Sequence, residues 1–110
     1  MKKSNYLVQL AAGAALLGFA TVPVHVQPAG ETRYKTKCAA CHGADGKGET
    51  AIGKTNKLRD LGSGDVQKQS DVELSAIITN GRNKMPGYGK SLKPEQIKEL
   101  VGHIRTLGKN

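Results

Sequence analysis

The feature that most constrains this chain is a shortage of large apolar side chains after its first 29 residues. From Gly30 to Asn110, valine, isoleucine, leucine and phenylalanine supply 14 of 81 residues, and 15 basic residues stand against 9 acidic ones. An apolar share of about 17%, below the roughly 20% at which disorder is expected, buries too little surface to offset conformational entropy. Either this stretch stays unfolded, or a group other than its own side chains fills the centre of the fold.

Residues 1–20 differ from the rest and are typical of a secretory signal peptide. A basic start precedes an apolar run from Leu7 to Ala20, and small residues at its end fit cleavage after Ala20. An uncleaved anchor is the alternative, because the run extends to Val26 and then approaches membrane-spanning length. Both interpretations place the folded part outside the cytoplasm. Residues 21–29 are expected to form a flexible lead-in.

Three helices follow from hydrophobic spacing and capping signals. The first is expected at about 31–41, which holds neither glycine nor proline. The second is expected at 70–81, because it opens with a Ser-x-x-Glu capping box and ends at a glycine. The third is expected at 94–107, where proline occupies the first position and apolar residues form one stripe. Since no strand pattern appears, the sequence predicts an all-α domain at 30–110.

A segment of about 27 residues, 43–69, separates the first two predicted helices and is rich in glycine and lysine. A structureless loop of that length is unusual within a small domain. It becomes acceptable if the loop wraps a bound group, which the composition also requires.

Residues 38–42 read Cys-Ala-Ala-Cys-His, the C-x-x-C-H pattern of covalent haem attachment. Positions three apart lie on one helix face, so the two thiols can form thioethers with two haem vinyl groups, and His42 can bind the iron. A redox dithiol expects a βαβ context, a zinc site expects four ligands, and a disulfide would leave the centre empty. One haem c, held through Cys38 and Cys41, is therefore the predicted cofactor.

Met85 is the predicted second axial ligand of the iron. It is the only methionine besides Met1 and precedes Pro86 in a glycine-rich segment. A thioether ligand raises the reduction potential and favours electron transfer over oxygen binding. The alternatives are a packing role for Met85, an unliganded iron, or ligation by His103. The position of His103 at the edge of the last helix's apolar stripe favours packing against the first helix instead.

With these residues in hand, the stretch 30–108 resembles the class I monohaem cytochromes c, most closely small bacterial periplasmic ones. Gly30 and Tyr34 match the small and aromatic residues of that family's first helix, and Leu100 matches its carboxy-terminal helix. The resemblance implies a small cytochrome c fold, with three main helices and loops wrapped around one covalently attached haem. It also implies the attachment site and distal ligand assigned above, and a role as electron carrier.

Two positions depart from the family's pattern. His103 stands where the family usually has an aromatic residue packed against the first helix. The family also often has a proline whose carbonyl accepts the Nδ1 proton of the proximal histidine, and residues 51–54 contain none. A backbone carbonyl near Ile52 or Gly53 is the expected acceptor instead. The remaining apolar residues are expected to line the pocket: Leu58, Leu61, Leu74, Ile77 and Tyr88.

The excess of positive charge predicts docking to redox proteins with acidic surfaces, because opposite charges speed encounter. Five lysines flank the two loops expected at the exposed haem edge: Lys47, Lys54, Lys57, Lys84 and Lys90. A basic surface that only keeps the protein soluble is the alternative. Nucleic acid is not an expected partner, because the protein is predicted to be exported and its basic residues are not clustered with aromatic ones.

The expected function is that of a soluble, monomeric, periplasmic electron carrier rather than an enzyme. Two alternatives stay open. One is a gas-binding haem sensor in which Met85 is displaced, which a thioether ligand disfavours. The other is an electron-entry module of a membrane-bound oxidoreductase, in contact with the membrane only if residues 7–20 are not cleaved.

Overall fold

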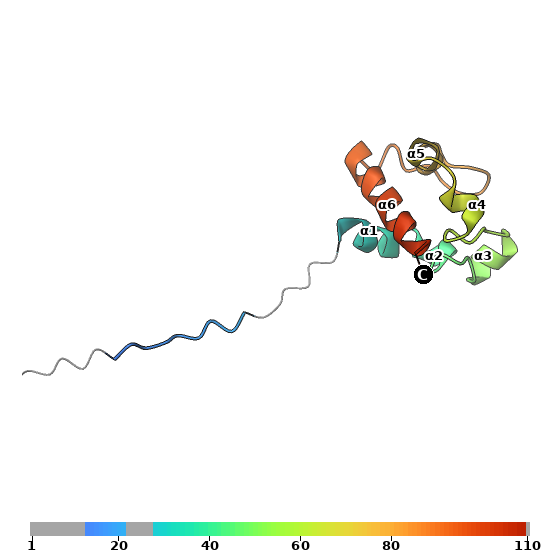
Figure 1. Ribbon diagram of the computed structural model, residues 1–110. Coiled ribbons are helices and arrows are strands. Elements are labelled where there is room, and N and C mark those ends of the chain that lie inside the picture. Colours follow the sequence, from blue (N-terminus) through green and yellow to red (C-terminus); the bar gives the residue numbers. More distant parts are fainter. Residues whose placement is uncertain (1–12, 22–27, 110) are drawn as a thin grey trace, which may run out of the picture.

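The computed structural model describes residues 13–21 and 28–109, and the folded part is helical (Figure 1). Within these residues six helices follow in chain order: α1 (Ala29–Lys37), α2 (Ala39–His42), α3 (Ala51–Thr55), α4 (Gly64–Gln67), α5 (Asp71–Asn80) and α6 (Pro94–Leu107). The only strand-like pairing in this part of the chain is an isolated bridge between Arg82 and Met85. The all-α class predicted from the sequence is confirmed.

The predicted signal peptide falls largely outside the described residues, as does most of the predicted lead-in. Residues 13–21 have no regular secondary structure, and Leu16 and Phe19 are exposed. Across 13–21 and 28–109, no helix combines the length and apolar character that crossing a membrane requires.

The first and last helices, α1 and α6, pack against each other (Figure 1). Gly30 makes the close approach possible, because a Cβ at this position would clash with the backbone oxygen of Glu99. Tyr34 is 1% exposed, and its ring centroid lies 4.7 Å from that of His103. Arg33 and Glu99 form an ion pair of 2.6 Å across the same contact. The predicted packing of His103 against the first helix is confirmed.

The first predicted helix is divided at Cys38. α1 ends at Lys37, and α2 begins at Ala39. The φ of Cys38 is −115°, yet its amide still donates to Tyr34 O at 2.8 Å. His42 N donates to Cys38 O at 2.9 Å. The chain therefore keeps its helical course through the C-x-x-C-H segment despite the break.

The expectation of a structureless segment at 43–69 is wrong, because this segment contains α3 and α4. Each helix begins with a side-chain cap. The Thr50 hydroxyl oxygen accepts from Gly53 N at 2.9 Å, and the Ser63 hydroxyl oxygen accepts from Val66 N at 3.4 Å. Helices of five and four residues are too short to show a hydrophobic period, which explains why spacing did not reveal them.

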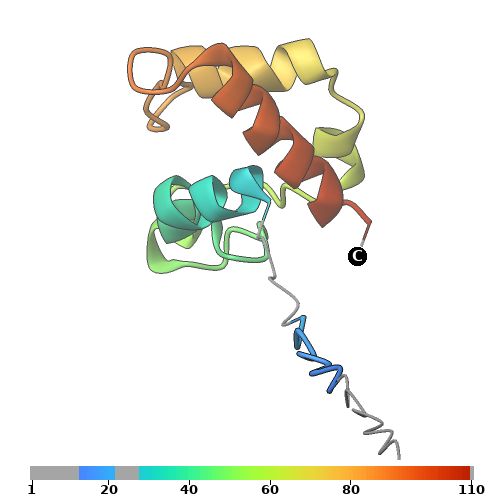
Figure 2. The same ribbon diagram turned by 90° about the vertical axis from the view of Figure 1, so that its left-hand side faces the viewer.

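The other two predicted helices are confirmed as α5 and α6. The capping box that opens α5 is formed, with Glu73 N donating to Ser70 Oγ at 3.1 Å and Ser70 N donating to Glu73 Oε2 at 2.7 Å. α6 lies between α1 and α5 and packs against both (Figure 2). The buried apolar core gathers around this junction: Tyr34, Val66, Leu74, Ile78, Leu92, Ile97, Leu100, Val101 and Ile104.

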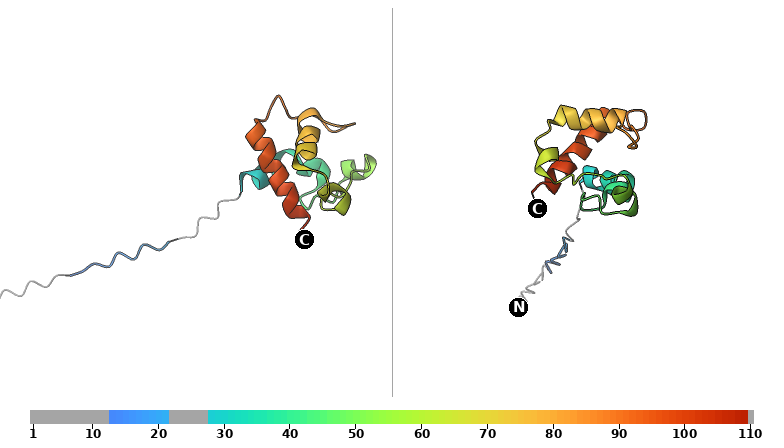
Figure 3. Two further views of the ribbon diagram at one scale, coloured as in Figure 1. Left: turned by 45° about the horizontal axis from the view of Figure 1, so that its top comes forward. Right: turned by 90° about the vertical axis from the view of Figure 1, so that its right-hand side faces the viewer.

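Two segments far apart in the sequence lie on the same side of the molecule in each view. They are α3 and the loop that follows α5, residues 81–89 (Figures 1 and 3). Residues of both segments line one cavity. This cavity contains the candidate site.

Candidate functional site

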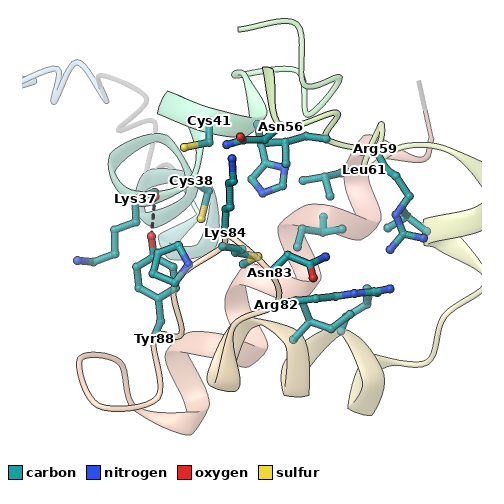
Figure 4. Close-up of a pocket in the computed structure, with 18 of the residues that line it drawn as sticks. Lys37, Cys38, Cys41, Asn56, Arg59, Leu61, Arg82, Asn83, Lys84 and Tyr88 are labelled. Carbon is teal, nitrogen blue, oxygen red and sulfur yellow. Dashed lines mark hydrogen bonds between the residues drawn. The ribbon is translucent and has the colours of Figure 1, made fainter. Parts of the chain in front are cut away.

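A cavity of about 570 Å³ opens between the α1–α2 segment, the α3–α4 region, α5 and the loop that follows α5 (Figure 4). This volume lies within the roughly 300–1,000 Å³ typical of cofactor pockets. All five residues predicted to line the pocket do so: Leu58, Leu61, Leu74, Ile77 and Tyr88. The inference that side chains alone do not fill the centre of this fold is therefore confirmed.

The four predicted haem-binding residues, Cys38, Cys41, His42 and Met85, all line this cavity. Both cysteines are free thiols on the α1–α2 wall (Figure 4). Burial raises the pKa of the Cys38 thiol to about 11, against the smaller opposing effect of the Lys37 ammonium. This thiol therefore stays protonated at neutral pH, unlike the low-pKa thiolates of redox and metal sites.

His42 faces the cavity as a neutral imidazole. It is half-buried, and burial lowers its pKa below the ordinary value of 6.5. The neutral form is the one that binds metals. Its Nδ1 is buried and has no hydrogen-bond partner among the described residues. The predicted bond to a carbonyl near Ile52 or Gly53 is therefore absent.

The backbone that carries His42 is held by the segment that leads into α3. Thr50 Oγ1 donates to Cys41 O at 2.6 Å, and Gly48 N donates to His42 O at 2.8 Å. Gly53 packs so closely that a Cβ would clash with Gly48 O and lie 2.8 Å from Cys41 O. The last two carbonyls of α2 are thus satisfied, as a helix end requires.

A tight turn presents Met85 to the cavity. Arg82 N donates to Met85 O at 3.1 Å, and Met85 N donates to Arg82 O at 2.9 Å. Asn83 takes φ +54°, which asparagine tolerates better than most residues. Gly81 has φ +78°, and a Cβ there would lie 2.6 Å from Met85 O. The position of Met85 is therefore set by its own backbone.

Tyr88 connects this turn to the opposite wall of the cavity. Its amide donates to Ile78 O at 2.8 Å, which returns the loop to α5. Its hydroxyl donates to Lys37 O at 3.2 Å, at the carboxyl end of α1 (Figure 4). Burial raises the pKa of Tyr88, so the hydroxyl remains a donor at neutral pH. Sequence analysis placed Tyr88 in the pocket but missed this contact.

His103 lies outside the cavity wall, against Tyr34. The alternative in which it binds the iron is therefore wrong. Its Nε2 is buried with no hydrogen-bond partner in the described part of the chain. Burial lowers its pKa, while the Glu31 carboxylate opposes this shift and the Lys35 ammonium adds to it.

The basic residues of the cavity wall only partly match the five predicted lysines. Lys57 and Lys84 line it, whereas the other three do not: Lys47, Lys54 and Lys90. Sequence analysis missed Lys37, Arg59 and Arg82, which also line the cavity.

The donor set fits a covalently bound haem. Two free thiols and a neutral imidazole line one wall, and a thioether lies on the loop that follows α5. Apolar side chains supply much of the remaining surface: Leu58, Leu61, Val66, Leu74, Ile77 and Ile104. The buried Nδ1 of His42 has no hydrogen-bond partner among the described residues, so no protein group there competes with a metal for this ring.

Comparisons with known proteins lead in the same direction. Residues 26–104 match the model of a family described as cytochrome c oxidase, cbb3-type, subunit III. The chain is 38% identical over 115 residues to cytochrome c6 of Nostoc sp., a match covering 99% of this chain and 95% of the relative. The solved c-type cytochrome KustC0563 is similar with a TM-score of 0.66 and 31% identity, covering 71% of this chain and 95% of that one.

A second kind of relative is longer. The chain is 37% identical over 76 residues to the cbb3-type cytochrome c oxidase subunit FixP of Azorhizobium caulinodans, a match covering 68% of this chain and 25% of the relative. It thus spans about a quarter of that subunit but nearly the whole of the cytochrome c6. The chain belongs to this cytochrome c family and is a small monohaem c-type cytochrome, a haem-based electron carrier.

Proposed function

We propose that the protein carries single electrons in the periplasm through one haem c, attached by Cys38 and Cys41 and ligated axially by His42 and Met85. The observation that carries this proposal is that one cavity collects all four residues from two segments more than forty positions apart. When bound, the haem supplies a ferric–ferrous couple.

The residues around the cofactor set its properties. The neutral imidazole of His42 supplies one ligand, and the thioether of Met85 supplies the other, which raises the reduction potential. The apolar wall limits access of water and favours the less charged ferrous state. The preformed Met85 turn reduces the rearrangement needed when the electron arrives or leaves, which suits a carrier better than a gas sensor.

The predicted signal peptide supports the periplasmic part of the proposal. We assign residues 1–20 to a signal peptide, 21–29 to a lead-in and 30–110 to the cytochrome c domain. The match to cytochrome c6 along 99% of the chain favours a separate, monomeric carrier with no catalytic activity of its own. The family match and the likeness to FixP favour a second candidate, an electron-entry module of an oxidase.

Redox proteins are the proposed partners, and their docking surfaces are proposed to be acidic. The chain has a formal net charge of +8, and five basic residues line the cavity: Lys37, Lys57, Arg59, Arg82 and Lys84. Opposite charge on a partner would bring it to the opening through which electrons pass.

Two measurements on the purified protein test this function. Intact mass should equal that of the processed chain plus one haem, because thioether bonds survive denaturation. The ferric protein should show the weak long-wavelength absorption of sulfur-to-iron ligation. A chain of haem-free mass, or a ferric spectrum lacking that band, would contradict the proposed cofactor or the proposed Met85 ligand respectively. Cell fractionation then distinguishes the two candidates: a free carrier is recovered in the soluble periplasmic fraction, and an anchored module in the membrane fraction.

A further inference from the structure

Two of the four arginines of the chain line the cavity from different segments. Arg59 lies between α3 and α4, and Arg82 lies in the loop after α5. Among the described residues, neither guanidinium forms a hydrogen bond or an ion pair. The other two arginines are paired: Arg33 with Glu99, and Arg105 with Asp71. The cavity arginines therefore have donor groups that the protein leaves unused.

Both side chains lie on the side of the cavity away from the thiols. Figure 4 shows Arg59 and Arg82 at that end, with Cys38 and Cys41 at the other. Lys37 and Lys84 lie on the side of the cysteines in the same view (Figure 4). Basic residues therefore stand at both ends, but the two guanidinium groups share one end.

The chemistry of haem makes this end distinctive. Its two vinyl groups lie on pyrrole rings opposite the two that carry propionates. If the vinyl groups are fixed at the thiols, the two carboxylates lie at the far end of the cavity. The planar guanidinium fork matches a carboxylate with two parallel hydrogen bonds, and such charge-assisted bonds are stronger than neutral ones.

We propose that Arg59 and Arg82 bind the two haem propionates. This inference rests on the proposed covalent haem. Arg82 already exchanges two backbone hydrogen bonds with Met85, at 3.1 and 2.9 Å. A carboxylate held by Arg82 therefore also steadies the turn that presents the axial ligand, while Arg59 fastens the α3–α4 region to the same cofactor.

The test uses the holoprotein with Arg59→Gln, Arg82→Gln and the double variant. Lys98→Gln is the matched control, because it removes one charge from an exposed residue of α6 away from the cavity. Arg59→Lys and Arg82→Lys keep the positive charge but remove the planar guanidinium that can form two parallel hydrogen bonds with a carboxylate. The measurements are the reduction potential at fixed pH and the propionate bending bands in the resonance Raman spectrum.

We expect each Arg→Gln change to lower the potential more than Lys98→Gln does, because a cation beside the carboxylates is lost. We expect the propionate bands to move to lower frequency in the Gln variants and part of the way in the Lys variants. Unchanged propionate bands in the double variant would overturn the proposal, even if electron transfer to a partner slowed, because that pattern assigns both arginines to docking. The intact mass and sulfur-ligation band of the unchanged protein report separately on the proposed function.

Discussion

At the scale of the residue, Met85 illustrates how the backbone positions a proposed ligand. The Arg82–Met85 turn, the positive φ of Asn83 and the close contact at Gly81 fix its backbone on the cavity wall, and its side chain packs against the buried apolar cluster. A thioether in this place competes with external ligands for the sixth position of the iron. Removing the thioether should therefore open this position to external ligands.

We expect Met85→Ala to retain the haem, lower the reduction potential and admit carbon monoxide to the ferrous iron. The drop should be on the order of 0.1 V, within the about 0.8 V that axial ligands span. Redox titration and carbon monoxide difference spectra measure both effects. Met85→His is the control, since a second imidazole should lower the potential while keeping carbon monoxide out. An unchanged potential without carbon monoxide binding would show that another group ligates the iron.

Site residues could be predicted from the sequence where a short motif or a single candidate residue identifies them. The Cys-x-x-Cys-His spacing and the single candidate methionine predicted the four residues of the proposed haem site, and all four line the cavity. Tyr88 was placed in the pocket, but its bond to Lys37 O joins positions 51 apart and depends on tertiary structure. The two cavity arginines were missed for the same reason, because nothing near them in the sequence marks them as different from Arg33.

At the scale of the element, the crossing of α1 and α6 holds the domain together. Gly30 packs under Glu99, and Tyr34 packs against His103. One capping box, a proline at a first helical position and apolar spacing revealed the long helices, because those signals are local. The short helices α3 and α4 carry no hydrophobic period, and their threonine and serine caps resemble ordinary loop residues.

The glycine contact of this crossing can be tested by comparing two helical glycines. Gly30→Ala should destabilise the holoprotein by about 1–3 kcal/mol, because its methyl group overlaps the Glu99 carbonyl. Gly102→Ala on α6 is the control: nothing lies within 4 Å of its Cβ, so it should stabilise by about 0.5–1 kcal/mol. Denaturant unfolding measures both. Equal effects of the two substitutions would contradict the close helix contact.

His103 gives the same crossing a dependence on pH. Its folded-state pKa lies below the ordinary 6.5, so the unfolded chain binds the proton more readily and stability falls as pH drops through and below about 6.5. We expect His103→Phe to remove this loss. It should also add about 1 kcal/mol at neutral pH, because it eliminates a buried nitrogen without a partner in the described chain.

Unfolding curves across mildly acidic and neutral pH give the comparison. Glu31 and Lys35 face the imidazole with opposite charges, so Glu31→Gln should enlarge the acid-induced loss by removing a group that favours the protonated ring. If His103→Phe and the unchanged protein lose stability in parallel toward acid pH, some other group is responsible.

At the scale of the whole molecule, net charge bears on partner encounter. Replacing Lys57 and Lys84 by glutamine should slow transfer to an acidic redox partner roughly tenfold at low salt, and should flatten the salt dependence. Lys98 and Lys109, exposed lysines outside the cavity wall, provide a control with equal charge loss. Stopped-flow rates across a salt series decide the point. Transfer rates that change neither with salt concentration nor with the substitution of Lys57 and Lys84 would contradict electrostatic steering.

The scarcity of apolar residues noted in the sequence recurs in the structure as a cavity beside a small core. Leu74 and Ile104 belong to the buried core and also line the cavity. The cofactor is then as much a part of the hydrophobic core as these side chains. The central claim is that the chain folds around its haem and does not fold without it.

Far-ultraviolet circular dichroism of the Cys38→Ala, Cys41→Ala double variant tests that claim most directly. Without thioether attachment the haem should be lost on purification, and the 570 Å³ cavity would leave too little buried surface to hold the helices. We expect most of the helical signal to disappear. A haem-free double variant with the helical content of the holoprotein would contradict the account.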